Sequence, residues 1–215
     1  MAKLKNKHTL PTIATLPISI DLDKLRESTD KLASKFTDVE SANPGLCDNH
    51  AELVKSVYDN FEQINLTTPS EVLPHTTSIK ERLRRREEHL YKVPTEDYTG
   101  SYFEEIVTQC QAPASRVRIT KLAPGKTIPF HVDYDIGYGV RCIVPIYGDK
   151  NVINLFKRNG EVEAYTLKDG TANFLNIGFP HAVVNMSKKP RIALMFTLDG
   201  TQDLMALSKN TIPFS

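Results

Sequence analysis

Three residues in the second half of the chain, His131, Asp133 and His181, have side-chain types and spacing suited to holding a metal ion. His131 and Asp133 lie two positions apart in TIPFHVDYD (127–135), which has the pattern of a strand entering a loop. Side chains at this separation on a strand share a face, so both can point at one centre. Two imidazoles and one carboxylate are the facial ligand set of non-haem Fe(II), and they leave coordination positions open for other molecules.

Each of these signals is weak when taken singly. A lone histidine in a strand, or an isolated His-x-Asp, is more often structural than functional. Asp135 is an alternative carboxylate, but in an extended strand it lies about 6–7 Å further along than Asp133. The three residues together, in this order within β-rich sequence, favour a metal site with Asp133 as the carboxylate ligand.

Arg191 follows His181 by ten residues and begins the next predicted strand. A guanidinium offers a carboxylate a planar, two-pronged partner that an ammonium cannot match. A dicarboxylate cosubstrate that chelates a metal through its keto-acid end leaves its far carboxylate free. We therefore expect Arg191 to bind that carboxylate, although by itself this residue would be interpreted as a surface cation.

Residues from about 112 onward have the pattern of a β-protein, with short alternating segments separated by glycine turns. Asn159-Gly160 is the strongest short signal for a hairpin, here over 152–167. Pro145 is expected at a sheet edge or bulge, because proline cannot donate to a strand ladder. Short, regularly spaced strands without intervening helices predict a sandwich or barrel. The remaining strands are expected at 116–122, 139–148, 171–176, 181–186 and 191–198.

The first half of the chain has helical periodicity instead. Apolar residues recur at helical spacing in three segments, a further short segment also suits a helix, and Asp21 and Ser78 stand where N-cap residues are preferred. Ser78 and Glu81 also have the spacing of a capping box. Helices are therefore expected at 21–36, 48–66, 78–93 and 101–110.

The segment RLRRR (82–86) is a basic cluster within the third of these helices. It could contact phosphates of a nucleic acid. Glu87 and Glu88 follow it at once, which favours a solvated helix face with mixed charge.

Three segments, KLAPGKTIPFHVDYD, GVRCIVPI and GFPHAVVNMSKKPRIALMFTL, resemble the iron(II)- and 2-oxoglutarate-dependent oxygenases. The closest resemblance is to the aspartyl/asparaginyl β-hydroxylase type, which includes some bacterial proline hydroxylases, and it covers roughly 115–200. It implies an α+β protein with a mainly β core, namely a double-stranded β-helix of the jelly-roll or cupin kind. The expected organisation is an N-terminal helical region (1–110) packed on a catalytic core (111–200), with a C-terminal tail (201–215), as one integrated domain.

The resemblance also implies roles for individual residues. His131, Asp133 and His181 would be the iron ligands, and Arg191 would bind the distal carboxylate of 2-oxoglutarate. Arg141 stands where a second arginine of this type approaches the cosubstrate, and Thr120 matches a hydroxyl residue one strand earlier. Two plainer interpretations remain open, in which Arg141 pairs with Asp149 or Asp135 at the sheet surface and Thr120 is an ordinary strand residue. Four further residues are candidates for holding the substrate: Tyr134, Tyr138, Arg116 and Arg118.

The implied activity is hydroxylation of an amino acid or amino-acid residue like proline, aspartate or asparagine. Fe(II), 2-oxoglutarate and dioxygen would be required, with release of succinate and carbon dioxide. An alternative is a cupin-type metal-dependent isomerase or small-ligand-binding protein, because a fold does not fix a function. The partner would be a small-molecule or peptide substrate.

Composition agrees with an ordinary globular protein of 215 residues, 40% hydrophobic and 25% charged. The net charge of +1 argues against a dedicated nucleic-acid binder. There is no long apolar run and no secretion-signal pattern near the N-terminus, so a soluble, cytoplasmic protein without a membrane partner is expected. Cys47, Cys110 and Cys142 form no CxxC pair and are interpreted as buried free thiols.

Overall fold

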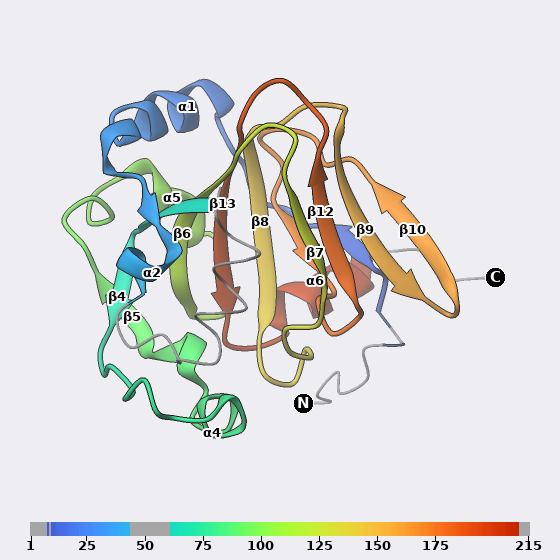
Figure 1. The fold of residues 1–215 in the computed structure, drawn as a ribbon, viewed down its shortest axis with the longest axis horizontal. Coiled ribbons are helices and arrows are strands. Elements are labelled where there is room, and N and C mark those ends of the chain that lie inside the picture. The colour runs from blue at the N-terminus through green and yellow to red at the C-terminus, as the bar shows by residue number, and fades with distance from the viewer. Residues whose placement is uncertain (1–7, 9, 44–60, 211–215) are drawn as a thin grey trace.

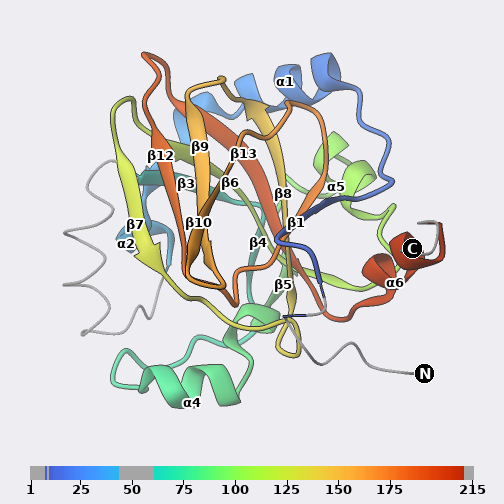
Figure 2. The same cartoon turned by 90° about the vertical axis from the view of Figure 1, so that its right-hand side faces the viewer.

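The computed structural model describes residue 8, residues 10–43 and residues 61–210. Two β-sheets dominate these residues and face each other (Figures 1 and 2). The larger has seven strands in the spatial order β1 (Ile13–Thr15), β11 (Asn173–Leu175), β8 (Val140–Tyr147), β13 (Arg191–Leu198), β6 (Ala114–Leu122), β3 (Phe61–Asn65) and β2 (Thr37–Asp38). The smaller has the order β10 (Glu161–Tyr165), β9 (Val152–Arg158), β12 (His181–Asn185) and β7 (Thr127–His131).

The eight consecutive strands β6 to β13 form a double-stranded β-helix. In chain order they alternate between the larger and the smaller sheet, except that β9 and β10 pair as a hairpin within the smaller one. Asn159 and Gly160 make that hairpin turn with positive φ angles of 52° and 85°, as the Asn-Gly signal requires. The jelly-roll core predicted from the sequence is confirmed.

Pro145 lies at a register shift between β8 and β13, so the predicted bulge is confirmed. The register passes from the pair Ile192–Tyr147 to the pair Ala193–Pro145 and skips one residue of β8. Strand β8 is a central strand of its sheet, and the bulge is what admits a proline there.

The N-terminal part contributes strands as well as helices. β1 extends one edge of the larger sheet, whereas β3 and β2 extend the other, and β4 (Thr67–Pro69) pairs with β5 (Tyr91–Pro94). The helices are α1 (Leu22–Asp30), α2 (Val39–Ala42), α4 (Ile79–Arg84), α5 (Tyr102–Val107) and α6 (Gln202–Asn210), with 3₁₀ turns η2 (Ala33–Lys35) and η3 (Glu87–Leu90). The proposed boundaries at 110/111 and 200/201 stay a prediction.

Two of the predicted helices need correction. Residues 61–65 form strand β3, so a helix over 48–66 is wrong at its C-terminal end; residues 48–60 lie outside those described. The helix expected at 78–93 ends at Arg84, because Arg86 adopts a left-handed conformation with φ of 53°. A 3₁₀ turn and strand β5 follow it.

The other helix predictions are confirmed, with shorter bounds. The side chain of Asp21 accepts hydrogen bonds from the backbone N–H groups of Asp23 and Lys24 and so caps α1. Ser78 caps α4 through the backbone N–H of Glu81. The helix within 101–110 is present as α5.

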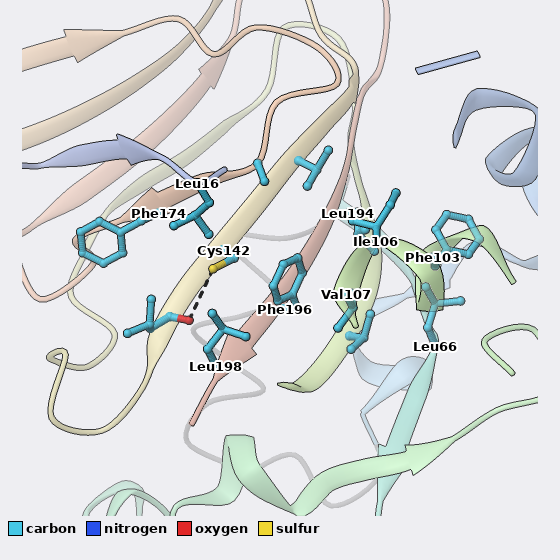
Figure 3. Packing of buried hydrophobic residues seen from close by; sticks show 14 of the residues in the cluster. Leu16, Leu66, Phe103, Ile106, Val107, Cys142, Phe174, Leu194, Phe196 and Leu198 are labelled. Carbon is cyan, nitrogen blue, oxygen red and sulfur yellow. Dashed lines mark hydrogen bonds between the residues drawn. The ribbon is translucent and has the colours of Figure 1, made fainter. Parts of the chain in front are cut away.

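Helices α1, α5 and α6 cover the outer face of the larger sheet, where the main hydrophobic core lies (Figures 2 and 3). Leu25 of α1 and Phe103 of α5 pack in this core with Cys142 of β8 and Phe196 of β13, all four almost fully buried. Cys142 is a buried free thiol and Cys110 a half-buried one, whereas Cys47 lies outside the described residues. The apolar outer face leaves the inner face of the same sheet free to carry polar side chains toward the smaller sheet.

No helix among the described residues combines the length and apolar character needed to cross a bilayer.

Asp203 of α6 ties the C-terminal helix to the start of the jelly roll. Its carboxylate accepts hydrogen bonds from the backbone N–H groups of Gln111 and Ala112, at 2.9 and 3.1 Å. Asp203→Ala should therefore lower the free energy of unfolding by about 1–3 kcal/mol, because a buried donor on Ala112 and a partly buried donor on Gln111 lose their acceptor. Urea unfolding would measure it. Glu96→Ala, at an exposed carboxylate, is the control, and an equal loss in both variants would contradict this role.

Candidate metal centre

Strands β7 and β12 place the two histidines opposite each other. His131 ends β7, His181 begins β12, and the antiparallel register pairs the two directly. Their ring centroids are 4.2 Å apart. Asp133 follows in the loop after β7, where its backbone N–H donates to the carbonyl of Ile177 at 3.3 Å. The pairing of β7 with β12 thus brings together two histidines that are fifty residues apart in the sequence.

The three side chains form the one group among the described residues that meets the geometric requirement for holding a metal ion. One ligand atom from each residue lies within 4.8 Å of the others. Nε2 of His131 is 3.4 Å from Oδ1 of Asp133. The prediction that His131, Asp133 and His181 converge is therefore met in the fold.

Backbone carbonyls fix which nitrogen of each ring faces this centre. Nδ1 of His131 lies 2.8 Å from the carbonyl oxygen of Pro129, and Nδ1 of His181 lies 3.1 Å from that of Phe179. A carbonyl can only accept, so each Nδ1 carries the proton and each neutral ring keeps a lone pair on Nε2. This is the usual arrangement of metal-binding histidines, and the donor set suits a borderline divalent ion such as Fe(II).

Burial keeps His181 in the form that a metal requires. Desolvation is the largest influence on this ring and lowers its pKa to about 4, although Asp133 acts in the opposite direction. The imidazole is therefore neutral at neutral pH, and a ligand must be deprotonated to bind.

A cavity of about 320 Å³ extends from these three residues between the two sheets. Its wall on the side of the larger sheet includes Arg191, which is 4% exposed. Nη1 of Arg191 lies 3.4 Å from Oγ1 of Thr120, and among the described residues no carboxylate pairs with this guanidinium. Burial alone lowers its pKa to about 10. A buried cation without an anionic partner is costly, and an anion entering the cavity would offset that cost.

Arg141 also lines the cavity, but its charge is compensated within the protein. Nη2 lies 3.2 Å from Oε2 of Glu88 and 3.5 Å from Oδ2 of Asp133, and Nε donates to the hydroxyl of Tyr134 at 3.1 Å. Pairing with Asp149 or Asp135 at the sheet surface is therefore wrong, because Arg141 is buried. It holds the outer oxygen of the carboxylate that faces the histidines.

Glu88 is the residue that sequence reasoning missed. Its carboxylate lies among Arg141, Arg116 and Arg118 and accepts from the hydroxyl of Thr197 at 3.1 Å. Burial would raise its pKa, but the three guanidiniums outweigh burial and lower it to about 2. In the sequence Glu88 is simply an acid that follows a basic run, and this pattern is typical of a solvated surface with mixed charge.

The remaining candidate residues lie in three different surroundings. Tyr134, Tyr138, Arg116 and Arg118 all line the cavity. Thr120 is fully buried and its hydroxyl donates to the carbonyl of Ala193, beside Arg191. Asp135 instead is exposed and accepts from the backbone N–H of Gly137 at 2.8 Å, so it stabilises the loop and does not belong to the group that could hold a metal.

All four arginines of the RLRRR cluster pair with carboxylates. Arg82 is buried and bonds Glu87, and the outer members pair as follows: Arg84 with Glu81, Arg85 with Glu71, and Arg86 with Asp199. The mixed-charge interpretation of this segment fits these pairs.

The sequence profile of the aspartyl/asparaginyl β-hydroxylase family matches residues 75–199, which is more than half of the chain and includes His131, Asp133, His181 and Arg191. No curated protein matches the chain significantly.

Three solved structures illustrate the structural similarity. An oxidoreductase of the 2OG-Fe(II) oxygenase family from Burkholderia pseudomallei is 14% identical, with a TM-score of 0.49 over 86% of this chain and 84% of that one. A prolyl-4-hydroxylase from Pseudomonas putida is 10% identical, with a TM-score of 0.49 over 88% and 93%. A cupin domain from Bordetella pertussis is 16% identical, with a TM-score of 0.33 over 43% and 88%. At these sequence identities and TM-scores, the three structures carry no argument about the chemistry of this chain.

Glu88 generates a prediction about stability and pH. Its pKa is about 2 in the fold against an ordinary value of 4.5, so its contribution is complete above about pH 5 and is lost as the pH falls toward 2. Glu88→Gln should lower the free energy of unfolding at pH 7 by about 3 kcal/mol, and this deficit should shrink toward pH 2.

Urea unfolding of both proteins between pH 7 and pH 2.5 would measure the deficit. Glu105→Gln, which removes an exposed partner of Lys24, is the control and should change little at any pH. A deficit for Glu88→Gln that is independent of pH would show that this carboxylate is not ionised among the arginines.

Proposed function

This chain belongs to the aspartyl/asparaginyl β-hydroxylase family, an enzyme family of the 2-oxoglutarate- and Fe(II)-dependent oxygenase type, and from this premise we propose how its own residues serve that chemistry. His131, Asp133 and His181 hold Fe(II), and Arg191 binds the distal carboxylate of 2-oxoglutarate. The substrate is an amino acid or amino-acid residue like proline, aspartate or asparagine. The observation that carries the proposal is the buried, uncompensated guanidinium of Arg191 in the same cavity as the three ligands.

A ferrous ion bound there would supply the redox chemistry by which dioxygen and 2-oxoglutarate hydroxylate a C–H bond, with release of succinate and carbon dioxide. The protein's part is binding and orientation. The two imidazoles present Nε2 because their Nδ1 protons are held by backbone carbonyls. Asp133 is oriented by Arg141, which in turn is held by Glu88 and Tyr134.

The wall that holds 2-oxoglutarate is built for a dicarboxylate. Arg191 offers two parallel N–H donors, and the hydroxyl of Thr120 lies beside it. The surrounding residues are apolar: Ile128, Ile143, Leu175, Val183 and Met195 line the same cavity. A charge pair formed there is screened little by water, which strengthens it.

A cupin-type isomerase would have no use for this arginine. It needs a metal, but it does not need a buried guanidinium kept free for a second carboxylate. Arg191 therefore favours the oxygenase over the isomerase, whereas a small-ligand-binding protein differs from the oxygenase in forming no succinate.

Metal affinity tests the ligand set. Asp133→Ala and His131→Ala should each weaken binding of Fe(II), which equilibrium dialysis under anaerobic conditions would measure. The loss should exceed the about 10- to 100-fold that is typical when a residue that only supports a metal ligand is changed. Asp135→Ala, two positions further along, should bind Fe(II) like wild type. If Asp135→Ala lost the metal and Asp133→Ala kept it, the ligand assignment would be wrong.

Arg191 tests the cosubstrate. Arg191→Gln should keep Fe(II) but weaken binding of 2-oxoglutarate by about 10- to 100-fold, because a charge-assisted pair is lost in a buried place. Calorimetry with the iron-loaded protein under anaerobic conditions would measure this, and Arg158→Gln is a control outside the cavity. Wild-type protein that binds no 2-oxoglutarate, and forms no succinate from it with any amino acid or peptide, would favour the cupin alternatives.

A further inference from the structure

The carboxylate of Asp133 has only long contacts to its neighbours. Among the described residues its charged partners are Nε2 of His131 at 3.4 Å and Nη2 of Arg141 at 3.5 Å. A charge-assisted hydrogen bond from nitrogen to a carboxylate is about 2.7–2.9 Å long, so neither contact holds the side chain tightly. The position of Asp133 therefore depends on its backbone, that is, on the loop of residues 132–139 that joins β7 to β8.

The second half of this loop is a compact turn closed by its own backbone. The backbone N–H groups of Tyr138 and Gly139 donate to the carbonyl of Asp135 at 3.0 and 3.3 Å. These hydrogen bonds do not involve the side chain of Asp135. Residues 135–139 therefore move as one unit, and whatever holds Tyr138 holds this part of the loop.

The 3₁₀ turn η3 holds Tyr138 at two of its atoms. The backbone N–H of Glu88 donates to the hydroxyl of Tyr138 at 2.9 Å. Nε2 of His89 lies 2.8 Å from the carbonyl oxygen of Tyr138, and this nitrogen carries the proton because a carbonyl can only accept. Arg86, directly before η3, donates to the same carbonyl at 2.5 Å. Three donors from one short segment thus converge on a single loop residue.

Both sides of this contact carry an unusual backbone requirement. Arg86 has a φ of 53°, a conformation that residues other than glycine rarely adopt, and it turns the chain from α4 into η3. On the loop side, a Cβ at Gly139 would lie 2.7 Å from Cγ2 of Thr197 and 3.3 Å from Nε2 of His89, so only glycine fits there. Strained backbone that is held by its surroundings is a reason to look for a functional constraint.

The ring of Tyr138 connects this contact to the metal centre. It stacks on the ring of Tyr134, with centroids 4.4 Å apart and planes inclined at 33°. Tyr134 follows Asp133 directly in the chain, and its hydroxyl accepts from Nε of Arg141 at 3.1 Å. A displacement of Tyr138 would therefore reach the residue next to Asp133 through a ring contact as well as through the backbone.

Resting on the proposed function, in which Asp133 is a metal ligand, we propose that Tyr138 is a positioning residue for that ligand. The turn η3 fixes Tyr138 by its hydroxyl and its carbonyl, and Tyr138 fixes the loop in which Asp133 meets the two histidines. A metal site needs its ligands within about 0.5 Å of the binding geometry. Tyr138 should therefore affect metal affinity without being a ligand itself.

Binding of Co(II) to the metal-free protein tests this role. Imidazole and carboxylate ligands also bind Co(II), and the absorption spectrum of the bound ion reports its coordination geometry. Tyr138→Phe removes the hydroxyl that accepts from Glu88, so it should weaken Co(II) binding by about 10-fold and change the spectrum. Tyr147→Phe removes a hydroxyl that donates to Asp30 outside the cavity, and this matched control should bind Co(II) like wild type.

Two variants at His89 separate positioning from a general loosening of the fold. His89→Ala removes a donor to the carbonyl of Tyr138 and should weaken Co(II) binding by a similar factor. His89→Gln keeps an N–H donor at about the same reach and should restore most of the affinity. Urea unfolding of every variant establishes that Co(II) affinities are compared between fully folded proteins.

Either of two outcomes would overturn the proposal. One is a Tyr138→Phe variant whose Co(II) affinity and spectrum equal those of wild type, and the other is a loss in His89→Ala that His89→Gln does not restore. Both can occur while wild type binds Co(II), and then only the positioning role fails. Wild-type protein that binds no Co(II) would overturn the proposed function and the positioning role with it.

Discussion

Burial of arginine charge between two β-sheets is the constraint on which this site depends. A guanidinium removed from water must find an anion, and the desolvation cost otherwise destabilises the fold. Glu88 supplies one anion to three arginines and Asp133 supplies another to Arg141. This network leaves Arg191 and Arg118 without full compensation. The fold therefore presents positive charge to the cavity that its own described residues do not fully neutralise.

The larger sheet can support this charge because its two faces have different environments. The outer face is closed by α1, α5 and α6 over an apolar core that includes Phe196 and Cys142 (Figure 3). Burial there contributes about 25 cal/mol for each Å² of apolar surface removed from water, which offsets the cost of a polar inner face. Strand β13 shows both roles at once, with Phe196 directed to the helices and Arg191 lining the cavity.

The sequence predicted those parts of the fold in which local pattern and final environment agree. The strand at 191–198 has its predicted bounds, and the hairpin at Asn159-Gly160 follows from turn chemistry alone. Strand β3 was misread because Phe61 and Ile64 have helical spacing, whereas Gln63 faces the cavity and breaks apolar alternation. When the inner face of a strand carries polar side chains, the alternation of apolar and polar residues that predicts a strand is lost. Glu88 was missed for a related reason, since its three arginine partners lie on distant strands.

The two halves of the site are fixed by different kinds of interaction. Each histidine is oriented by the carbonyl two residues before it, Pro129 for His131 and Phe179 for His181. This hydrogen bond to a carbonyl two residues earlier is local, and it sets the tautomer of a histidine at either end of a strand. The arginines instead depend on sheet register and on Glu88, which are long-range. A change at the arginines should therefore leave the two histidines oriented, and within the described residues the contact of Arg141 with Asp133 joins the arginine network to the ligand set.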